Sequence, residues 1–266
     1  FGAYLQKNLA LKAGDRIAIM MPNVLQYPVV LFGAMRAGLI IVNTNPLYTP
    51  REMEHQFNDA GVKAIVILEN FATNLQEIVH NTNIKHIILT GIGDMLGFPK
   101  KMIVNFAVRH IKKMVPAYKL PNVIRFNDTL RAGGQLKVNK YKAKSNDIAC
   151  LQYTGGTTGV SKGAMLTHRN IMSNMEMISA WMYSQEDFLI EGKEIVITAL
   201  PLYHIFAFVV NCLTTVKHGG HSILITNPRD MDSFIKDLKK YPFSLMTGVN
   251  TPVSYTHLTL PTSYPV

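Results

Sequence analysis

The residues with the clearest capacity for chemistry lie in one short segment, Tyr153-Thr-Gly-Gly-Thr-Thr-Gly-Val-Ser-Lys-Gly163. Its four glycines among eleven residues let the backbone turn tightly and expose N–H groups. The hydroxyls of Thr154, Thr157 and Thr158 can donate hydrogen bonds to phosphate oxygens, and Lys162 adds a cation. An ordinary flexible turn would need neither the threonines nor the lysine. The segment therefore predicts a phosphate-binding loop.

The elements around this loop follow a regular alternation. Strands are predicted at 16–21, 39–42, 63–68, 85–90, 147–153, 194–200, 221–225 and 243–246. Helices are predicted at 25–37, 50–60 and 74–79, and another begins near 167–170. Thr49, Pro50 and Glu52 resemble a helix start, and Gly61 suits its end. We expect an α/β fold of alternating β-α units, with largely parallel sheets covered by helices.

Composition sets the broad class of protein. The chain has 266 residues, of which 48% are apolar and 17% charged, so it is globular rather than disordered. Cys150 and Cys212 lie in apolar segments without CxxC spacing, which argues against a disulfide framework or a zinc site and favours a reducing compartment. We expect no signal peptide and no spanning helix, since Arg36 interrupts the longest apolar stretch.

Positive charge gathers in one window. The net charge is +10, from 27 Lys and Arg against 17 Asp and Glu. Residues 95–144 hold twelve Lys and Arg against the single acid Asp128, a net charge of +11, so the rest of the chain sums to −1. Met, Ile, Val and Phe alternate with Lys and Arg at 95–114, where Ile103, Phe106 and His110 can share one helical side. The window predicts a peripheral contact with an anionic membrane, or simply a basic surface packed on its own domain.

The loop differs from the common nucleotide-binding motifs. It contains no Gly-Lys-[Ser/Thr] triplet and no GxGxxG at a strand end. It closely resembles the phosphate-binding signature of the adenylate-forming enzymes, Y-T-[ST]-G-T-T-G-x-P-K-G. The departures are Gly155, where Thr or Ser is common, and Ser161, where Pro is common. Despite both changes, Thr157, Thr158 and Lys162 can still supply the donors to phosphate.

Three further segments resemble the same family. Leu200-Pro-Leu-Tyr-His204-Ile-Phe-Ala207 is similar to its next core motif, in which an aromatic-His pair opens a helix. On this reading His204 lies beside the acyl-substrate and α-phosphate region, whereas the simpler reading makes it a satisfied helix-cap histidine. Two earlier segments look like parts of the N-terminal lobe of the same enzymes, namely Leu11–Asn23 and Asn43–Tyr48. Residues 151–170 most resemble bacterial long-chain fatty-acid–CoA ligases.

The resemblance implies a specific reaction. Such enzymes join a fatty acid to ATP as an acyl-adenylate, release pyrophosphate, and transfer the acyl group to coenzyme A (CoA). It further implies that Thr154, Gly155, Gly156, Thr157, Thr158, Gly159 and Lys162 bind the phosphates of ATP. Thr154 would also help hold Mg²⁺, and His204 would act at the reacting centre. Fatty acid, ATP and CoA are then the expected ligands of a cytoplasmic enzyme, with no nucleic-acid partner.

Parts of the family pattern are missing from the sequence. We find no G-Y-G-x-T-E motif, ribose-binding Asp or C-terminal domain with its catalytic Lys, and Phe1 falls within what looks like an opening helix. We therefore expect residues 1–251 to be a partial N-terminal AMP-binding domain without turnover, carrying a basic insertion at about 95–144. The alternatives are a short-chain or aryl-acid ligase, a peptide-synthetase adenylation domain, or a non-catalytic basic membrane-binding module.

The final residues form a separate hypothesis. The resemblance ends after Thr251, and Val253–Thr262 is the translation of GTCTCTTATACACATCTGACGCTGCCGACG, a transposase-type sequencing adaptor. We expect residues 252–266 to be a non-native, exposed tail without site residues. The alternative is a genuine edge strand, because Tyr255, Thr256, Leu258 and Thr259 have fair β propensity. Amplifying the genomic locus would decide between the two readings.

Overall fold

The computed structural model describes residues 1–154, 161–182, 184 and 189–248. Contacts divide the chain into two compact units. The first unit contains Phe1–Met21 and Leu25–Asn170. The second unit contains Pro22–Val24 and the described residues from Ile171 onward.

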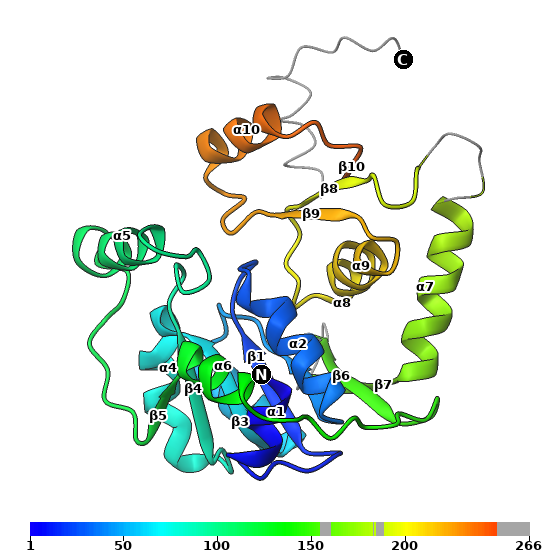
Figure 1. Ribbon diagram of the computed structural model, residues 1–266. Coiled ribbons are helices and arrows are strands. Elements are labelled where there is room, and N and C mark those ends of the chain that lie inside the picture. The colour runs from blue at the N-terminus through cyan, green and yellow to red at the C-terminus, as the bar shows by residue number, and fades with distance from the viewer. Residues whose placement is uncertain (155–160, 183, 185–188, 249–266) are drawn as a thin grey trace. The chain divides into compact units, whose positions relative to one another are not determined.

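The first unit is built on a seven-stranded sheet with strand order β5-β4-β3-β1-β2-β6-β7 (Figure 1). The strands are β1 (Arg16–Met20), β2 (Ile40–Asn43), β3 (Val62–Leu68), β4 (His86–Thr90), β5 (Val123–Arg125), β6 (Ile148–Thr154) and β7 (Lys162–Thr167). Neighbouring strands run parallel from β5 through β6, and only β7 is antiparallel to its neighbour. The prediction of a largely parallel α/β fold is confirmed.

Helices cover this sheet on both faces. The α-helices are α1 (Gly2–Lys7), α2 (Gln26–Arg36), α3 (Pro50–Ala60), α4 (Ala72–Ile78), α5 (Lys100–Phe106) and α6 (Phe126–Gly134). Short 3-10 helices η1 (Glu69–Phe71) and η2 (Val79–Asn81) flank α4, and the π-helix η3 (Ala107–Ile111) continues α5. Helix α1 contacts α2 and α6 in one layer, whereas α3 contacts α4 in the other.

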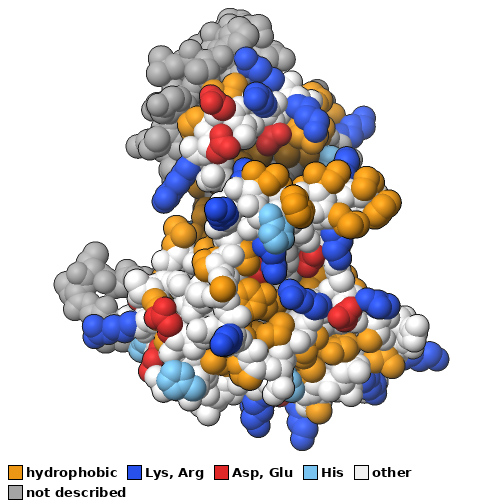
Figure 2. Space-filling view, turned by 90° about the vertical axis from the view of Figure 1, so that its left-hand side faces the viewer, with side chains coloured by type: hydrophobic (Ala, Val, Ile, Leu, Met, Phe, Trp, Pro, Cys, Tyr) orange, Lys and Arg blue, Asp and Glu red, His pale blue; other side chains and the backbone are white. Residues whose placement is uncertain are grey.

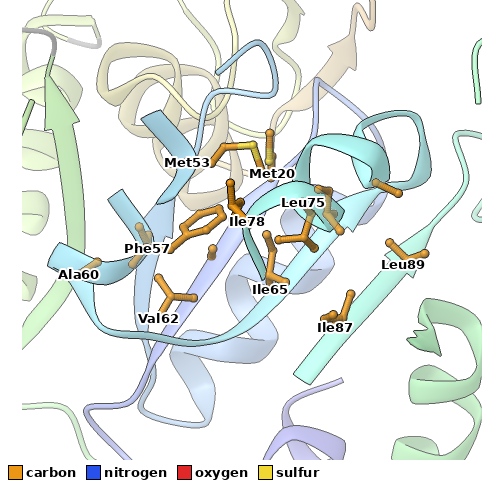
Figure 3. Packing of buried hydrophobic residues seen from close by; sticks show 14 of the residues in the cluster. Met20, Met53, Phe57, Ala60, Val62, Ile65, Leu75, Ile78, Ile87 and Leu89 are labelled. Atoms are coloured by element: carbon orange, nitrogen blue, oxygen red, sulfur yellow. The ribbon is translucent and has the colours of Figure 1, made fainter. Parts of the chain in front are cut away.

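One apolar core of the first unit lies between the sheet and α3–α4. Met53 and Phe57 of α3 and Leu75 of α4 lie against strand residues such as Met20 and Ile65, as Figure 3 shows. Strand β3, with sequence VKAIVIL, is almost completely buried because both sheet faces are covered. A continuous apolar run, rather than an alternating one, is therefore what this position requires.

Helix α3 begins and ends as the sequence predicts. The Thr49 hydroxyl accepts a hydrogen bond from the Glu52 backbone N–H at 3.4 Å, and the Glu52 carboxylate accepts one from Thr49 N–H at 2.8 Å. Pro50 occupies the first turn, and Gly61 ends the helix in the left-handed region at φ 61°. This helix carries three side chains that contact the strands or the loop described below.

Thr49→Ala should lower the free energy of unfolding of the first unit by about 1 kcal/mol. Hydrogen bonds from the Thr49 backbone and then its hydroxyl hold the pKa of Glu52 below its usual value. The contribution of the Glu52 carboxylate to the free energy of unfolding is therefore present at neutral pH, and it is lost as the pH falls through that lowered pKa. Urea unfolding at neutral and acidic pH measures both effects. Thr49→Ser keeps the hydroxyl and should be unchanged; an equal loss in both variants would contradict the capping role.

The second unit has a three-stranded parallel sheet with order β10-β8-β9. Its strands are β8 (Ile195–Thr198), β9 (His221–Leu224) and β10 (Leu245–Thr247). Its helices are α8 (Ile205–Ala207), the π-helix η4 (Phe208–Thr214), α9 (Thr215–Lys217) and α10 (Met231–Lys240), and α7 (His168–Met182) enters it from the first unit. Phe234 and Leu238 of α10 pack against the sheet residues Ile197 and Ile223.

Every strand and helix predicted from the sequence is present, with ends shifted by a few residues at most. Two features were not predicted. Residues 162–167 form β7, which returns antiparallel to β6, and part of the basic window forms β5 and α6. That part of the window belongs to the sheet and its covering layer. Within the described residues, no helix is both long and apolar enough to cross a bilayer.

Candidate functional site

The glycine-threonine loop connects β6 to β7. Thr154 at the end of β6 and Lys162 at the start of β7 are register partners, and both side chains are exposed. The structure therefore brings these two predicted site residues together at the two ends of the loop. Gly155, Gly156, Thr157, Thr158 and Gly159 lie outside the described residues.

Ser161 links the end of the loop to its start. Its hydroxyl donates to the Thr154 carbonyl at 2.9 Å, and its own carbonyl lies 2.9 Å from Nε2 of His55 on α3. This contact joins residues 106 positions apart in the sequence. Ser161 replaces the Pro that is common in the resembled signature, and its hydroxyl closes the loop in a way that a proline cannot.

Gly163 makes room for Tyr153. A Cβ on Gly163 would lie 2.8 Å from the Tyr153 ring, which is too close for an ordinary contact. The Tyr153 hydroxyl donates a hydrogen bond to Asp59 on α3. Burial raises the pKa of Tyr153, and the neighbouring Asp59 raises it further. Tyr153 is thus a neutral anchor of the hairpin, and the glycine is required by packing rather than by phosphate.

A buried polar network lies beneath the hairpin. The Asn43 amide group, at the end of β2, donates to the Gln152 side chain at 3.2 Å and accepts from the Tyr27 hydroxyl at 2.7 Å. Gln56 of α3 donates to the Asn43 backbone carbonyl at 3.0 Å. These bonds join the carboxyl ends of β2 and β6, where ligands of parallel sheets bind.

His204 lies in the second unit, at the N-cap of α8. Its backbone carbonyl accepts a hydrogen bond from Phe208 N–H at 2.9 Å, but its exposed side chain makes no capping bond. His204 is thus the helix-cap residue that the simpler reading expects, although its imidazole takes no part in the cap.

Asn23 fixes the segment before His204. This buried residue belongs to the second unit, and its amide donates to the carbonyls of Thr198 and Leu200, both at 2.9 Å. Its side-chain oxygen accepts from Leu202 N–H at 2.8 Å. The chain around Pro201 is therefore held by one asparagine rather than by strand pairing.

The cysteines are structural. Cys150 and Cys212 are free and buried, and burial raises the pKa of each thiol to about 12. In the part of the chain that the structure describes, no group of three or more His, Cys, Asp or Glu side chains could hold a metal ion.

Sequence reasoning missed the supporting residues His55, Asn43 and Asn23. The last two had a usable signal, because both are polar residues at the carboxyl end of an apolar strand: Asn43 ends β2, and Asn23 follows β1 by three positions. His55 had none, since its partner Ser161 becomes a neighbour only in the folded chain.

Curated relatives share much of this sequence. Residues 1–259 match the AMP-binding enzyme family. The chain is 56% identical over 251 residues to a long-chain-fatty-acid–CoA ligase of Salmonella typhimurium strain LT2, covering 94% of this chain and 44% of the relative. A ligase of the same name from Bacillus subtilis strain 168 is 35% identical over 251 residues, covering 94% of this chain and 43% of the relative. The chain thus spans less than half the length of these relatives.

The fold also matches solved structures. A benzoate CoA ligase from Burkholderia xenovorans LB400 superposes with a TM-score of 0.74 at 18% identity, covering 100% of this chain and 45% of that one. At this identity the likeness shows the fold alone. The family match, in contrast, extends over nearly all of the sequence, including both motifs, and the chain belongs to the AMP-binding enzyme family.

Proposed function

We propose that this chain is part of a long-chain fatty-acid–CoA ligase. In the reaction of such a ligase, the carboxylate of a fatty acid attacks the α-phosphorus of ATP, which forms an acyl-adenylate and releases pyrophosphate. The thiol of CoA then takes the acyl group, and AMP leaves. The identity of 56% to a relative of that name supports this substrate class. The observation that carries the proposal is the hairpin, which sets Thr154 opposite Lys162 at the ends of a glycine-threonine loop.

The chemistry of the first step assigns work to these residues. A carboxylate is a weak nucleophile, and the phosphorus it attacks is surrounded by negative oxygens. Catalysis therefore depends mainly on positioning and charge neutralisation. We propose that Lys162 and the loop from Thr154 to Gly159 hold the β- and γ-phosphates. The contacts of Ser161 and His55 keep the loop ends together, which limits the entropy lost on binding.

Magnesium fits the donor set at the start of this loop. The exposed Thr154 hydroxyl is a hard oxygen ligand, and Mg²⁺ needs few protein ligands when phosphates supply the rest. When bound, the ion would lower the negative charge on the phosphate oxygens. Gly155, Gly156, Thr157, Thr158 and Gly159 are proposed phosphate ligands through their N–H groups and hydroxyls.

We propose that His204 acts at the reacting carboxylate. Its side chain is exposed and makes no capping bond, so the imidazole is available to a ligand. Asn23 would be a positioning residue for this segment.

CoA is the proposed acyl acceptor. We further propose a cytoplasmic location with peripheral contact to an anionic membrane, from which a long-chain fatty acid can be drawn.

Lys162→Ala should weaken ATP use by about 1–3 kcal/mol, the value of a charge-assisted phosphate contact. The experiment uses the protein extended to the length of its relatives and measures acyl-adenylate formation at limiting ATP. The loss should be in the apparent affinity for ATP, because the lysine is assigned to the phosphates.

Lys142→Ala is the matched control, since Lys142 is an exposed lysine of the same unit outside the hairpin. It should leave adenylation unchanged. Unchanged kinetics in Lys162→Ala would refute the assignment of the loop. Normal adenylation with benzoate but none with a long-chain acid would refute the substrate class while leaving the loop assignment intact.

A further inference from the structure

The helical segment 100–111, made of α5 and η3, has its polar side toward the protein. Lys101, Asn105 and Arg109 recur every fourth residue and so share one side. Each has a partner on the first unit: Lys101 and Asn105 contact Asp94 at 3.7 and 2.9 Å, and Arg109 pairs with the buried Glu69.

The hydrogen bonds and ion pairs of this segment form a connected network with residues 91–94 and Glu69. Asn105 also accepts a hydrogen bond from Gly93 N–H at 2.8 Å, and Asp94 itself is fixed by Gly91 N–H at 2.8 Å. A cavity of about 400 Å³ lies on this side, lined mainly by charged and amide side chains. None of the residues in α5 or η3 is buried. Hydrogen bonds and ion pairs thus hold the segment, and no fully buried apolar face supports it.

The larger apolar side chains of the segment are exposed, whereas Val104, Ala107 and Val108 are half-buried. Ile103 is 63% exposed and Phe106 60%. Together with five other exposed apolar residues they form an apolar patch; these five are Leu96, Phe98, Met102, Ile111 and Met114. Figure 2 shows hydrophobic side chains beside Lys and Arg on the face that carries α5. A helix with its polar side inward and its apolar side outward is the reverse of ordinary surface helices.

Positive charge borders this apolar patch. Lys100, Lys112 and Lys113 are exposed and form no ion pair within the described residues. They flank the segment at both ends, whereas the paired cations Lys101 and Arg109 lie on the inner side. An outer surface that combines apolar side chains with unpaired cations is complementary to the headgroup and acyl boundary of an anionic bilayer.

We propose that residues 96–114 dock the protein onto anionic lipid bilayers, with Ile103 and Phe106 inserted and Lys112 and Lys113 at the headgroups. The polar attachment to Asp94 and Glu69 fixes the segment so that its apolar side faces the membrane. This inference rests on the membrane contact in the proposed function and names the protein surface that makes the contact. It does not depend on the ATP chemistry, so Lys162→Ala should bind vesicles normally.

The test is co-sedimentation of the chain with vesicles of phosphatidylcholine alone or with about one third phosphatidylglycerol. Binding should be at least about tenfold stronger to the anionic vesicles and should weaken in high salt. The double variant I103S/F106S should lose at least about tenfold in binding. K112E/K113E should lose its preference for anionic vesicles.

Matched controls identify the surface. Met177→Ser replaces another helical side chain that is 63% exposed and should bind like the parent. K140E/K142E removes two exposed lysines of the basic window outside the segment and should keep the anionic preference. Equal binding to neutral vesicles, an unaffected I103S/F106S, or equal losses in these controls would overturn the proposal.

A second measurement reports insertion directly. Phe106→Cys can be labelled with an environment-sensitive fluorophore, because the native Cys150 and Cys212 are buried. The label should shift to the blue on anionic vesicles, whereas a label at Met177→Cys should not. Absence of the shift at position 106 would overturn insertion even if the protein sediments with vesicles.

Discussion

Replacing Phe57 by alanine is expected to lower the free energy of unfolding of the first unit by about 3–5 kcal/mol. Phe57 is 0% exposed and lies in the cluster that joins α3 and α4 to the sheet (Figure 3). The substitution removes a large apolar surface and leaves a cavity that the packed strands can fill only partly.

The loss should extend to the loop. Helix α3 carries His55, Gln56 and Asp59, which contact Ser161, Asn43 and Tyr153 respectively. An α3 released from the core would no longer hold the hairpin. We therefore expect the β6–β7 hairpin to open more often, although Phe57 itself lies between α3 and the sheet and does not contact the loop.

Hydrogen–deuterium exchange measured by peptide is the suitable readout, because the two units need not unfold together. Exchange should rise in peptides covering 50–68 and 148–154. Phe98→Ala, at a residue that is 86% exposed, is the matched control and should change exchange in neither. Similar effects from Phe57→Ala and Phe98→Ala would show that the cluster does not stabilise α3.

Asn23→Ala should destabilise the second unit by about 2–4 kcal/mol. Three hydrogen bonds are lost, and the carbonyls of Thr198 and Leu200 lose a buried donor. Buried polar groups that lose their partners cost more than the net value of the bonds themselves. The Thr226 hydroxyl bond to the Asn23 backbone carbonyl, at 2.9 Å, should remain.

The same exchange method tests this variant in peptides covering 195–204. Asn174→Ala, at an exposed position of α7, is the control and should change protection little. In the full-length protein, Asn23→Ala should also reduce adenylation, because it positions the segment before His204. Normal protection around Leu202 in Asn23→Ala would contradict that positioning role.

The sequence by itself determined the strands and helices, and it led to the hypothesis of a phosphate-binding loop. Strand β3 and helix α3 were predictable because burial on both faces gives a continuous apolar run, and because Thr49, Glu52 and Gly61 are local signals. The phosphate-binding loop stays a prediction, and it too rests on local signals. Its glycines, hydroxyls and lysine are neighbours in the chain, so their combined chemistry does not depend on the fold.

Only the tertiary structure decided which distant residues support that loop and which way the basic segment faces. The packing of Tyr153 on Gly163 comes from the pairing of β6 with β7, and the contact of His55 with Ser161 comes from α3 lying beside that hairpin. The amphipathic pattern at 100–111 was visible in the sequence, but periodicity cannot tell which side of a helix meets the protein. Asp94 and Glu69 decide it, because their carboxylates pair with Lys101 and Arg109 and so turn that side of the helix toward the first unit.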